Sequence, residues 1–241
     1  MDTKLLKAQD SAHVKEIKKE RGMYNDDFYD IYIRMGFLRK VYGLLSLQII
    51  VTTVVASVFA YAPVFRDVFY SNHLVIVINA FVSIGLLIAL CIKQRHFPIN
   101  LFLLLLFNIV NAISIGIVIR RYDADFVVKS LVSTLIITAS LTVYTFQTKY
   151  ELTRKNAGLL ISILVFVKLR LINVFLGCSG LELALSGIST IIFCFYFVFD
   201  TQMMMHKLNP EDYIVATISL YIDILEIFLN LLRLFGDRKR K

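Results

Sequence analysis

Seven long apolar runs dominate this sequence and determine what it can fold into. They cover approximately residues 41–61, 74–92, 99–119, 126–146, 157–176, 181–205 and 213–235. A bilayer core of about 30 Å requires about 20 apolar residues in a helix, and the runs have that length. A run such as LFLLLLFNIV is apolar on every side, so it lacks the alternation of a membrane-barrel strand. The runs predict an all-α membrane protein, a seven-helix transmembrane bundle.

The composition agrees with this prediction. Of the 241 residues 58% are hydrophobic and the mean hydropathy is +0.71, which excludes an ordinary soluble domain. We expect a charged cytosolic tail over residues 1–36, the bundle over residues 37–236 and a basic tail over residues 237–241. Residues 1–36 contain no apolar stretch of the kind found in a signal peptide, so the first span is expected to act as the insertion signal.

The net charge of +8 indicates anionic lipid headgroups as the partner, and no nucleic acid, because the basic residues lie in the tails and connectors. Cytosolic connectors are enriched in Lys and Arg, which places Lys93, Arg95, Arg154 and Lys155 on the cytosolic side together with the N-terminus. Seven crossings would put the basic residues 238–241 on the opposite side. Either the last segment is re-entrant or the rule fails there, and the tail favours a re-entrant segment.

Enzymatic and cofactor motifs do not appear in the sequence. Cys91, Cys178 and Cys194 lie inside or beside apolar runs without CxxC spacing, so we interpret them as core thiols rather than as disulfide or zinc ligands. The sequence offers no P-loop, GxSxG or HExxH in a usable context. We therefore expect neither an enzyme nor a cofactor.

Two aspartates lie within apolar runs. Asp200 ends the stretch IIFCFYFVFD, and Asp223 lies near the middle of the last run. A charged side chain in hydrocarbon costs several kcal/mol, so an intramembrane carboxylate is a functional candidate. At 1.5 Å per residue the two would lie roughly 7 and 14 Å from the same membrane surface, close enough to meet if the helices tilt.

Asp223 belongs to a polar stripe on the last predicted helix. With helical spacing, the residues on this stripe are Ser219, Asp223, Glu226, Asn230 and Arg233. Such a stripe has to face polar groups or water, which predicts an ion pathway in the protein interior. The alternative is that these groups only join helices to one another. Two acids on one face repel each other, and this favours the pathway.

Lys168 and Arg170 are unusual residues for the fifth run. They are candidate counter-ions for Asp200 or Asp223, since a buried opposite charge offsets part of the cost of desolvation. The alternative is a shorter helix from which both side chains reach the interface.

Four stretches resemble the transmembrane BAX inhibitor motif family, and its Golgi anti-apoptotic, or Lifeguard, branch in particular. They are IRMGFLRKVYGLLSLQ from Ile33, KQRHFPINLFLL from Lys93, LTVYTFQTKYELTRKNAGLL from Leu141 and FCFYFVFDTQMMMHKLNPEDYIVATISLYIDILEIFLNLLR from Phe193. The resemblance implies a seven-helix bundle, described in some members as six spans and a re-entrant segment. It also implies residence in Golgi or endoplasmic reticulum membranes, a calcium leak from these stores, and inhibition of apoptosis.

The resemblance also implies roles for individual residues. Bacterial relatives use two aspartates as a pH-sensitive gate, and these match Asp200 of the FDTQ motif and Asp223 of the LYID motif. Glu211, in the NPED turn, matches an acidic position of the Golgi branch. The chain departs from the pattern where Glu226 replaces an asparagine and Asn111 replaces a glutamate. An arginine that pairs with the aspartates in bacterial relatives has no match in the second run, and the basic pair of the fifth run has no family counterpart.

The leading hypothesis is a pH-sensitive, calcium-permeable leak channel. Asp200 and Asp223 would form its gate and bind calcium in transit, with Glu226 and Glu211 along the route, because carboxylate oxygens are natural ligands of a hard divalent cation. Two acids held close together would share a proton near neutral pH. The alternatives are a non-conducting membrane adaptor that binds apoptosis regulators or calcium-release channels, and a proton-coupled cation exchanger. The oligomeric state stays open.

Overall fold

The computed structural model describes residues 32–60, 73–147 and 179–236, and these residues are helical throughout apart from short connectors. The part described contains no β-strand. In chain order the elements are the helix Tyr32–Ala60, α3 (His73–Lys93), α4 (Ile99–Ile119), α5 (Ala124–Gln147), α7 (Ser179–His206), the 3-10 helix η3 (Pro210–Asp212) and α8 (Tyr213–Phe235).

The apolar runs predicted most of the helix limits. Helices α4 and α8 begin and end at the predicted residues, and α3, α5 and α7 extend slightly further at both ends. The first helix begins at Tyr32, well before the predicted residue 41, because Arg34, Arg39 and Lys40 are good helix formers although they are too polar to count as part of a span. The fifth run, residues 157–176, lies outside the described residues.

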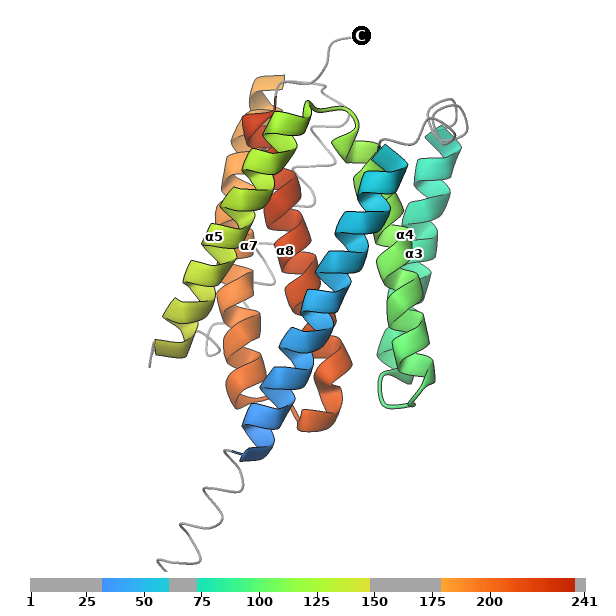
Figure 1. Cartoon of the computed structure of the whole chain (residues 1–241), viewed down its shortest axis with the longest axis vertical. Coiled ribbons are helices and arrows are strands. Elements are labelled where there is room, and N and C mark those ends of the chain that lie inside the picture. Colours follow the sequence, from blue (N-terminus) through green and yellow to red (C-terminus); the bar gives the residue numbers. More distant parts are fainter. Residues whose placement is uncertain (1–31, 61–72, 148–178, 237–241) are drawn as a thin grey trace, which may run out of the picture. The chain divides into compact units, whose positions relative to one another are not determined.

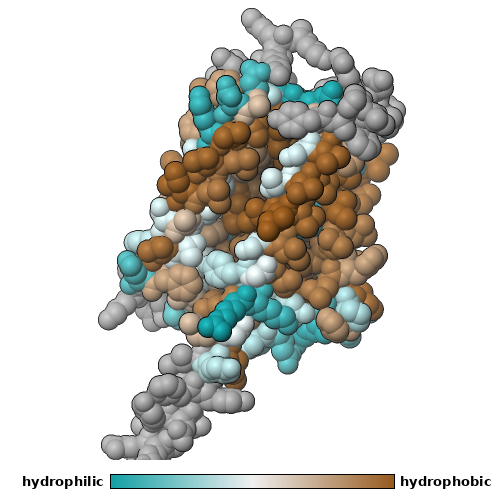
Figure 2. Space-filling model, in the orientation of Figure 1, coloured by the Kyte–Doolittle hydropathy of each residue, from teal (hydrophilic) through white to brown (hydrophobic). Residues whose placement is uncertain are grey.

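Five of the described helices are long and apolar enough to cross a membrane, and α3 contributes a shorter apolar helix from Ile78 to Lys93. Large apolar side chains such as Phe81, Phe102, Leu135 and Ile191 are more than half exposed on the helix surfaces. In Figure 2 apolar residues cover much of the face in view, and the hydrophilic residues gather mainly toward its two ends. Such a surface is stable in hydrocarbon and not in water, so the chain is an all-α membrane protein.

The described residues divide into two units, with the boundary between Lys40 and Val41 in the first helix. In the second unit α7 packs along α8, α3 packs along α4, and α5 contacts both α7 and α8 (Figure 1). Helix α8 is the most enclosed element, since 61% of its most apolar stretch is buried against at most 44% in the other spanning helices. A hydrophobic core cluster of this second unit consists of Ala56, Ile115, Tyr122, Val127, Phe228 and Leu232.

Helix α8 is a single unbroken helix of 23 residues. It spans roughly 35 Å at 1.5 Å per residue, which exceeds the hydrocarbon thickness of a bilayer. It runs antiparallel to α7 along the length of the bundle (Figure 1). A re-entrant segment has to turn back within the membrane, and α8 contains no such turn, so its length and composition are those of a helix that can cross.

The described cysteines differ from the expected core thiols. Cys91 is exposed on α3 and Cys194 is half-buried on α7, and both are free thiols. Cys91 lies in an apolar stretch, but that stretch presents this side chain outward, and hydropathy alone does not distinguish the two faces of an apolar helix. Cys178 lies outside the described residues.

Candidate functional site

The two intramembrane aspartates come from neighbouring antiparallel helices joined by a tight turn. At the end of α7 the amides of Lys207 and Leu208 donate to the carbonyl oxygen of Met203, at 2.9 and 3.0 Å. The turn then continues into η3, where the amide of Asp212 donates to the carbonyl oxygen of Asn209 at 2.9 Å. These bonds satisfy the carbonyl groups at the helix end and bring α8 back along α7.

Asp200 and Asp223 face one another across this hairpin. The hydroxyl of Ser219 on α8 donates to the carboxylate of Asp200. Asp223 is close enough to Asp200 for the two charges to interact. Asp223 is only 5% exposed. The structure therefore brings together the two acids that the sequence placed at different depths, as the short turn and the antiparallel packing allow.

Asp223 carries an unsatisfied acceptor. Its Oδ2 atom is buried and has no hydrogen-bond partner in the part of the chain that the structure describes. A buried carboxylate oxygen without a donor costs free energy, so it is a poor choice for a group that only joins helices. This geometry leaves the Oδ2 atom open to a proton, a water molecule or a cation.

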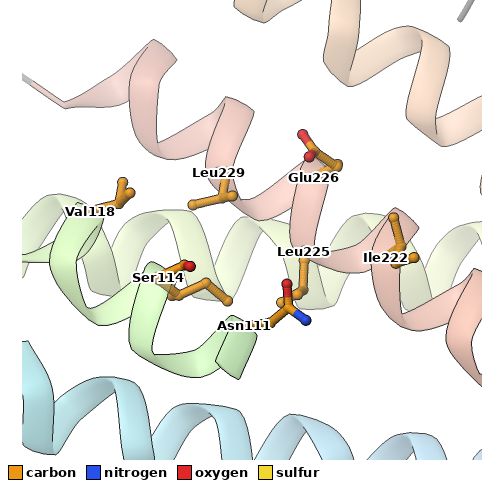
Figure 3. Close-up of a pocket in the computed structure, with 8 residues that line it drawn as sticks. Asn111, Ser114, Val118, Ile222, Leu225, Glu226 and Leu229 are labelled. Atoms are coloured by element: carbon orange, nitrogen blue, oxygen red, sulfur yellow. The ribbon is translucent and has the colours of Figure 1, made fainter. Parts of the chain in front are cut away.

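Glu226 extends the acidic cluster along α8. Its carboxylate is half-buried and interacts electrostatically with Asp223. It borders a cavity of about 130 Å³ between α4 and α8, whose polar lining residues on α4 are Asn111 and Ser114. In Figure 3, Leu225 points toward Asn111, while Glu226 leaves the opposite side of α8. The charge of Glu226 is thus directed away from α4.

Asn111 and Ser114 are held by α3. The hydroxyl of Ser83 donates to the side-chain oxygen of Asn111 at 3.2 Å, and the amide of Asn79 donates to the hydroxyl of Ser114. The Asn111 amide in turn donates to the carbonyl oxygen of Phe107 at 2.8 Å. The two departures from the family pattern, Asn111 and Glu226, consequently line one cavity, with the amide on α4 fixed by its own partners.

The C-terminal part of the polar stripe on α8 consists of Asn230 and Arg233, which contact each other. Asn230 is fully buried, and Arg233 donates from Nη1 to its side-chain oxygen at 3.2 Å. Arg233 therefore contacts an amide three residues earlier on the same helix. Of the predicted stripe, Ser219, Asp223 and Glu226 form the acidic cluster with Asp200.

A buried hydrogen-bond network beside the acidic cluster escaped the sequence analysis. The hydroxyl of Thr52 lies 2.7 Å from the side-chain oxygen of Asn108 on α4 and 2.8 Å from the Tyr221 hydroxyl on α8. The Asn108 amide donates to the carbonyl oxygen of Gln48 at 3.1 Å. The Gln48 side chain is itself 4% exposed and has no partner among the described residues. The available signal was weak: Gln48 and Thr52 lie four residues apart, on one face of the first helix.

An ion pair joins the two helical hairpins at one end of the bundle. Arg95, in the α3–α4 connector, contacts both carboxylate oxygens of Asp212 in η3, with a shortest nitrogen–oxygen distance of 2.9 Å. Next to it, the Asn100 amide donates to the Tyr213 hydroxyl at 3.0 Å. The sequence analysis used Arg95 only as an orientation signal, because its partner lies far away in the chain.

Of the remaining predicted residues, only Glu211 lies in the part of the chain that the structure describes. Glu211 is exposed in η3, in the turn between α7 and α8. Lys168 and Arg170 lie outside the described residues. Across residues 32–60, 73–147 and 179–236 no group of three His, Cys, Asp or Glu side chains could hold a metal ion.

Comparisons of the sequence with known proteins identify the family of this chain. The family model described as "Inhibitor of apoptosis-promoting Bax1" matches residues 34–240. Among similar proteins, Protein lifeguard 4 of Mus musculus is 36% identical over 211 residues, covering 88% of this chain and 89% of the relative. The Golgi anti-apoptotic protein of Vaccinia virus (strain Lister) is 35% identical with the same coverage, and Bax inhibitor 1 of Schizosaccharomyces pombe is 31% identical over 85% of this chain and 77% of the relative. The family model matches most of this chain, and two relatives at 35–36% identity cover 88% of it. The chain therefore belongs to the Bax1-inhibitor, or BAX inhibitor motif, family of membrane proteins.

Proposed function

We propose that this protein is a pH-sensitive, calcium-permeable leak channel whose gate is the pair Asp200 and Asp223. The observation that carries the proposal is the meeting of these two acids between α7 and α8, with one oxygen of Asp223 buried and without a protein partner in the described structure. Buried acids that repel one another are costly, and a membrane protein keeps them where a cation or proton has to pass. Carboxylate oxygens are the ligands that Ca²⁺ prefers.

The pair also supplies a physical basis for sensitivity to pH. When both acids are ionised they repel each other and attract a divalent cation, and a single proton removes the repulsion and weakens that attraction. A change in proton occupancy would therefore alter both the cation affinity of the pair and the spacing of α7 and α8. Glu226 lines the route beyond Asp223, and we place exposed Glu211 at its mouth.

The wider proposal follows the relatives. The viral relative is named a Golgi anti-apoptotic protein, and we propose that this chain acts in Golgi or endoplasmic reticulum membranes, where it lowers store calcium and inhibits apoptosis. We include residues 157–176 as the remaining span of a seven-helix bundle with a cytosolic N-terminus. The end of α5 and the start of α7 lie at opposite ends of the bundle, which supports one further crossing between them (Figure 1). Lys168 and Arg170 in that span remain proposed counter-ions.

The test is calcium flux through the purified protein in liposomes that contain a calcium-sensitive dye. We expect a flux that changes with pH in the wild type, and a flux that no longer responds to pH in Asp223→Asn or Asp200→Asn. The matched control is Asp125→Asn, the same change at an exposed aspartate in the first turn of α5. The control should retain the flux and the pH response of the wild type.

Two outcomes would contradict the channel. If Asp223→Asn conducts calcium with an unchanged pH response, the acids do not form the gate. If the folded wild-type protein passes no calcium at any pH, the non-conducting adaptor, which binds apoptosis regulators or calcium-release channels, becomes the better account. Flux that requires an imposed pH gradient would identify a proton-coupled exchanger instead.

A further inference from the structure

A second cavity, of about 220 Å³, lies apart from the acidic cluster. Its walls come from residues 49–57 of the first helix, the last turns of α4, residues 124–138 of α5 and residues 224–228 of α8. None of the four residues Asp200, Ser219, Asp223 and Glu226 lines it. Figure 2 shows that the apolar face of the molecule is hollowed between neighbouring ridges of side chains.

The lining offers an occupant almost nothing but hydrocarbon. The inner wall is formed by Ile115, Val127 and Phe228, which are 8% exposed or less. Four threonines and Ser57 also line the cavity. Thr53, Thr134 and Thr138 each donate their hydroxyl to a carbonyl oxygen four residues earlier in the same helix, at 2.7 to 2.8 Å. The hydroxyl of Thr52 lies 2.8 Å from the carbonyl oxygen of Gln48 and 2.7 Å from the side-chain oxygen of Asn108. A threonine bonded in this way does not need a polar ligand, so the cavity suits an apolar one.

The cavity opens sideways toward lipid. Val128 and Leu135 on α5 line it and are 57% and 62% exposed, whereas Thr134, one residue from Leu135, is only 4% exposed. Exposure thus rises from the inner wall to a rim that is apolar on α5, while Thr53 and Ser57 form its exposed edge on the first helix. In a membrane protein such a rim contacts acyl chains and not water, so the occupant comes from the bilayer.

Size and shape select among bilayer components. The volume of 220 Å³ exceeds the roughly 150 Å³ apolar cavity that admits a benzene ring. The lining on α5 extends from Ala124 to Thr138, a length of roughly 20 Å along the helix. This volume spread over that length leaves a narrow slot, which accommodates a flexible chain better than rigid fused rings.

We propose that this cavity is a lateral binding site for one acyl chain of a bilayer phospholipid. The chain would fill the space between α5 and α8 and would contact Ile224 and Leu225, the two residues that follow Asp223. An interior void forfeits the dispersion contacts of its lining atoms, and a bound chain restores them. The site does not depend on ion conduction, and its test requires none.

The experiment uses the full-length protein in phosphatidylcholine vesicles that contain a trace of phosphatidylcholine with a diazirine in the middle of one acyl chain. After photolysis, mass spectrometry locates the labelled residues. We expect label on the cavity-lining side of α5, at Leu131 and Thr134. Leu131→Trp, which fills the cavity, should lower that label several-fold, and Leu135→Trp, which blocks the exposed rim without changing the core, should do the same.

Val132→Trp is the matched control. Val132 neighbours Leu131 on α5, is 50% exposed and does not line the cavity, so its replacement should leave the cavity label unchanged. The proposal is overturned if both faces of α5 are labelled equally and neither cavity variant alters the pattern, because that describes ordinary annular lipid. Absence of label from the cavity residues means that a protein segment fills the space, and this result overturns the proposal. Stronger labelling by a photoreactive sterol than by the phospholipid identifies a different ligand and also overturns the proposal.

Discussion

Gly116 on α4 lies at a close approach of α4 and the first helix, and replacing it with alanine tests how tightly they are packed. A Cβ atom at Gly116 would lie 2.8 Å from the backbone oxygen of Ala56 and 2.8 Å from the Cβ atom of Phe59. Both neighbours belong to the helix frame rather than to the flexible end of a side chain. Carbon atoms normally pack about 3.5–4.0 Å apart, so the helices have to separate by roughly 0.7 Å to admit the methyl group.

The expected cost follows from two opposing terms. Overpacking of a tight interface typically costs about 1–3 kcal/mol. Alanine stabilises a helix by about 0.8–1 kcal/mol relative to glycine, which offsets part of this cost. Gly85 in α3 provides the matched control, because a Cβ atom there meets nothing within 4 Å. Gly85→Ala gains the same helix propensity without the clash, so the difference between the two variants isolates the overpacking term at about 1–3 kcal/mol.

The assay is reversible unfolding of both variants in detergent micelles, followed by circular dichroism as denaturant is added. We expect Gly85→Ala to be at least as stable as the wild type, and the free energy of unfolding of Gly116→Ala to be lower than that of Gly85→Ala. The same separation should disturb the Thr52–Asn108 contact, which joins the same two helices at 2.7 Å. Equal stability of the two variants would refute the close approach of these helices.

Three further predictions test other contacts. A double-mutant cycle of Thr52→Val and Tyr221→Phe, measured by denaturation, should give a coupling free energy of about 0.6 kcal/mol and at most about 1.7 kcal/mol, as for other interhelical hydrogen bonds in membranes. A coupling of zero would show that the bond contributes nothing to stability. Arg95→Gln or Asp212→Asn should each cost no more than about 1 kcal/mol, because Arg95 is 55% exposed and screened by solvent. The cost should vanish at about 1 M salt, where the Debye length is about 3 Å, and a loss of stability that is insensitive to salt would contradict this interpretation. Glu226→Asn should lower calcium flux in liposomes while keeping its pH response, because it removes one interacting carboxylate and leaves the gating pair; an unchanged flux would place Glu226 outside the route.

The sequence predicted what depends on the energy of single residues in lipid. Apolar length located the helices, and the cost of burying a charge selected Asp200 and Asp223 before any contact between them was known. The short turn between their helices made it reasonable that they meet. Helical spacing shows which residues share a face, as Arg233 does with Asp223, but not which neighbour that face contacts, so the contact of Arg233 with Asn230 came only from the structure.

Features that depend on contacts between distant parts of the chain could not be predicted. Thr52, Asn108 and Tyr221 are each unremarkable within an apolar run, and nothing in their positions shows that three helices bring them within 2.8 Å. The Arg95–Asp212 ion pair joins residues more than a hundred positions apart. Cavities pose the same difficulty, since their volume depends on how well several helix surfaces fit one another.

Asn111 and Glu226 show how the fold changes the meaning of a sequence difference. Compared with the pattern of the family, they are two separate departures, one that loses a carboxylate and one that gains a carboxylate. In the structure they line opposite walls of one cavity, so the number of acids around it is unchanged. Yet Glu226 leaves the far side of α8 and interacts with Asp223, whereas Asn111 is bonded to α3 (Figure 3). The exchange therefore moves negative charge from α4 toward the Asp200–Asp223 pair, and this is where we expect the ion selectivity of this chain to differ from that of relatives with the usual pattern.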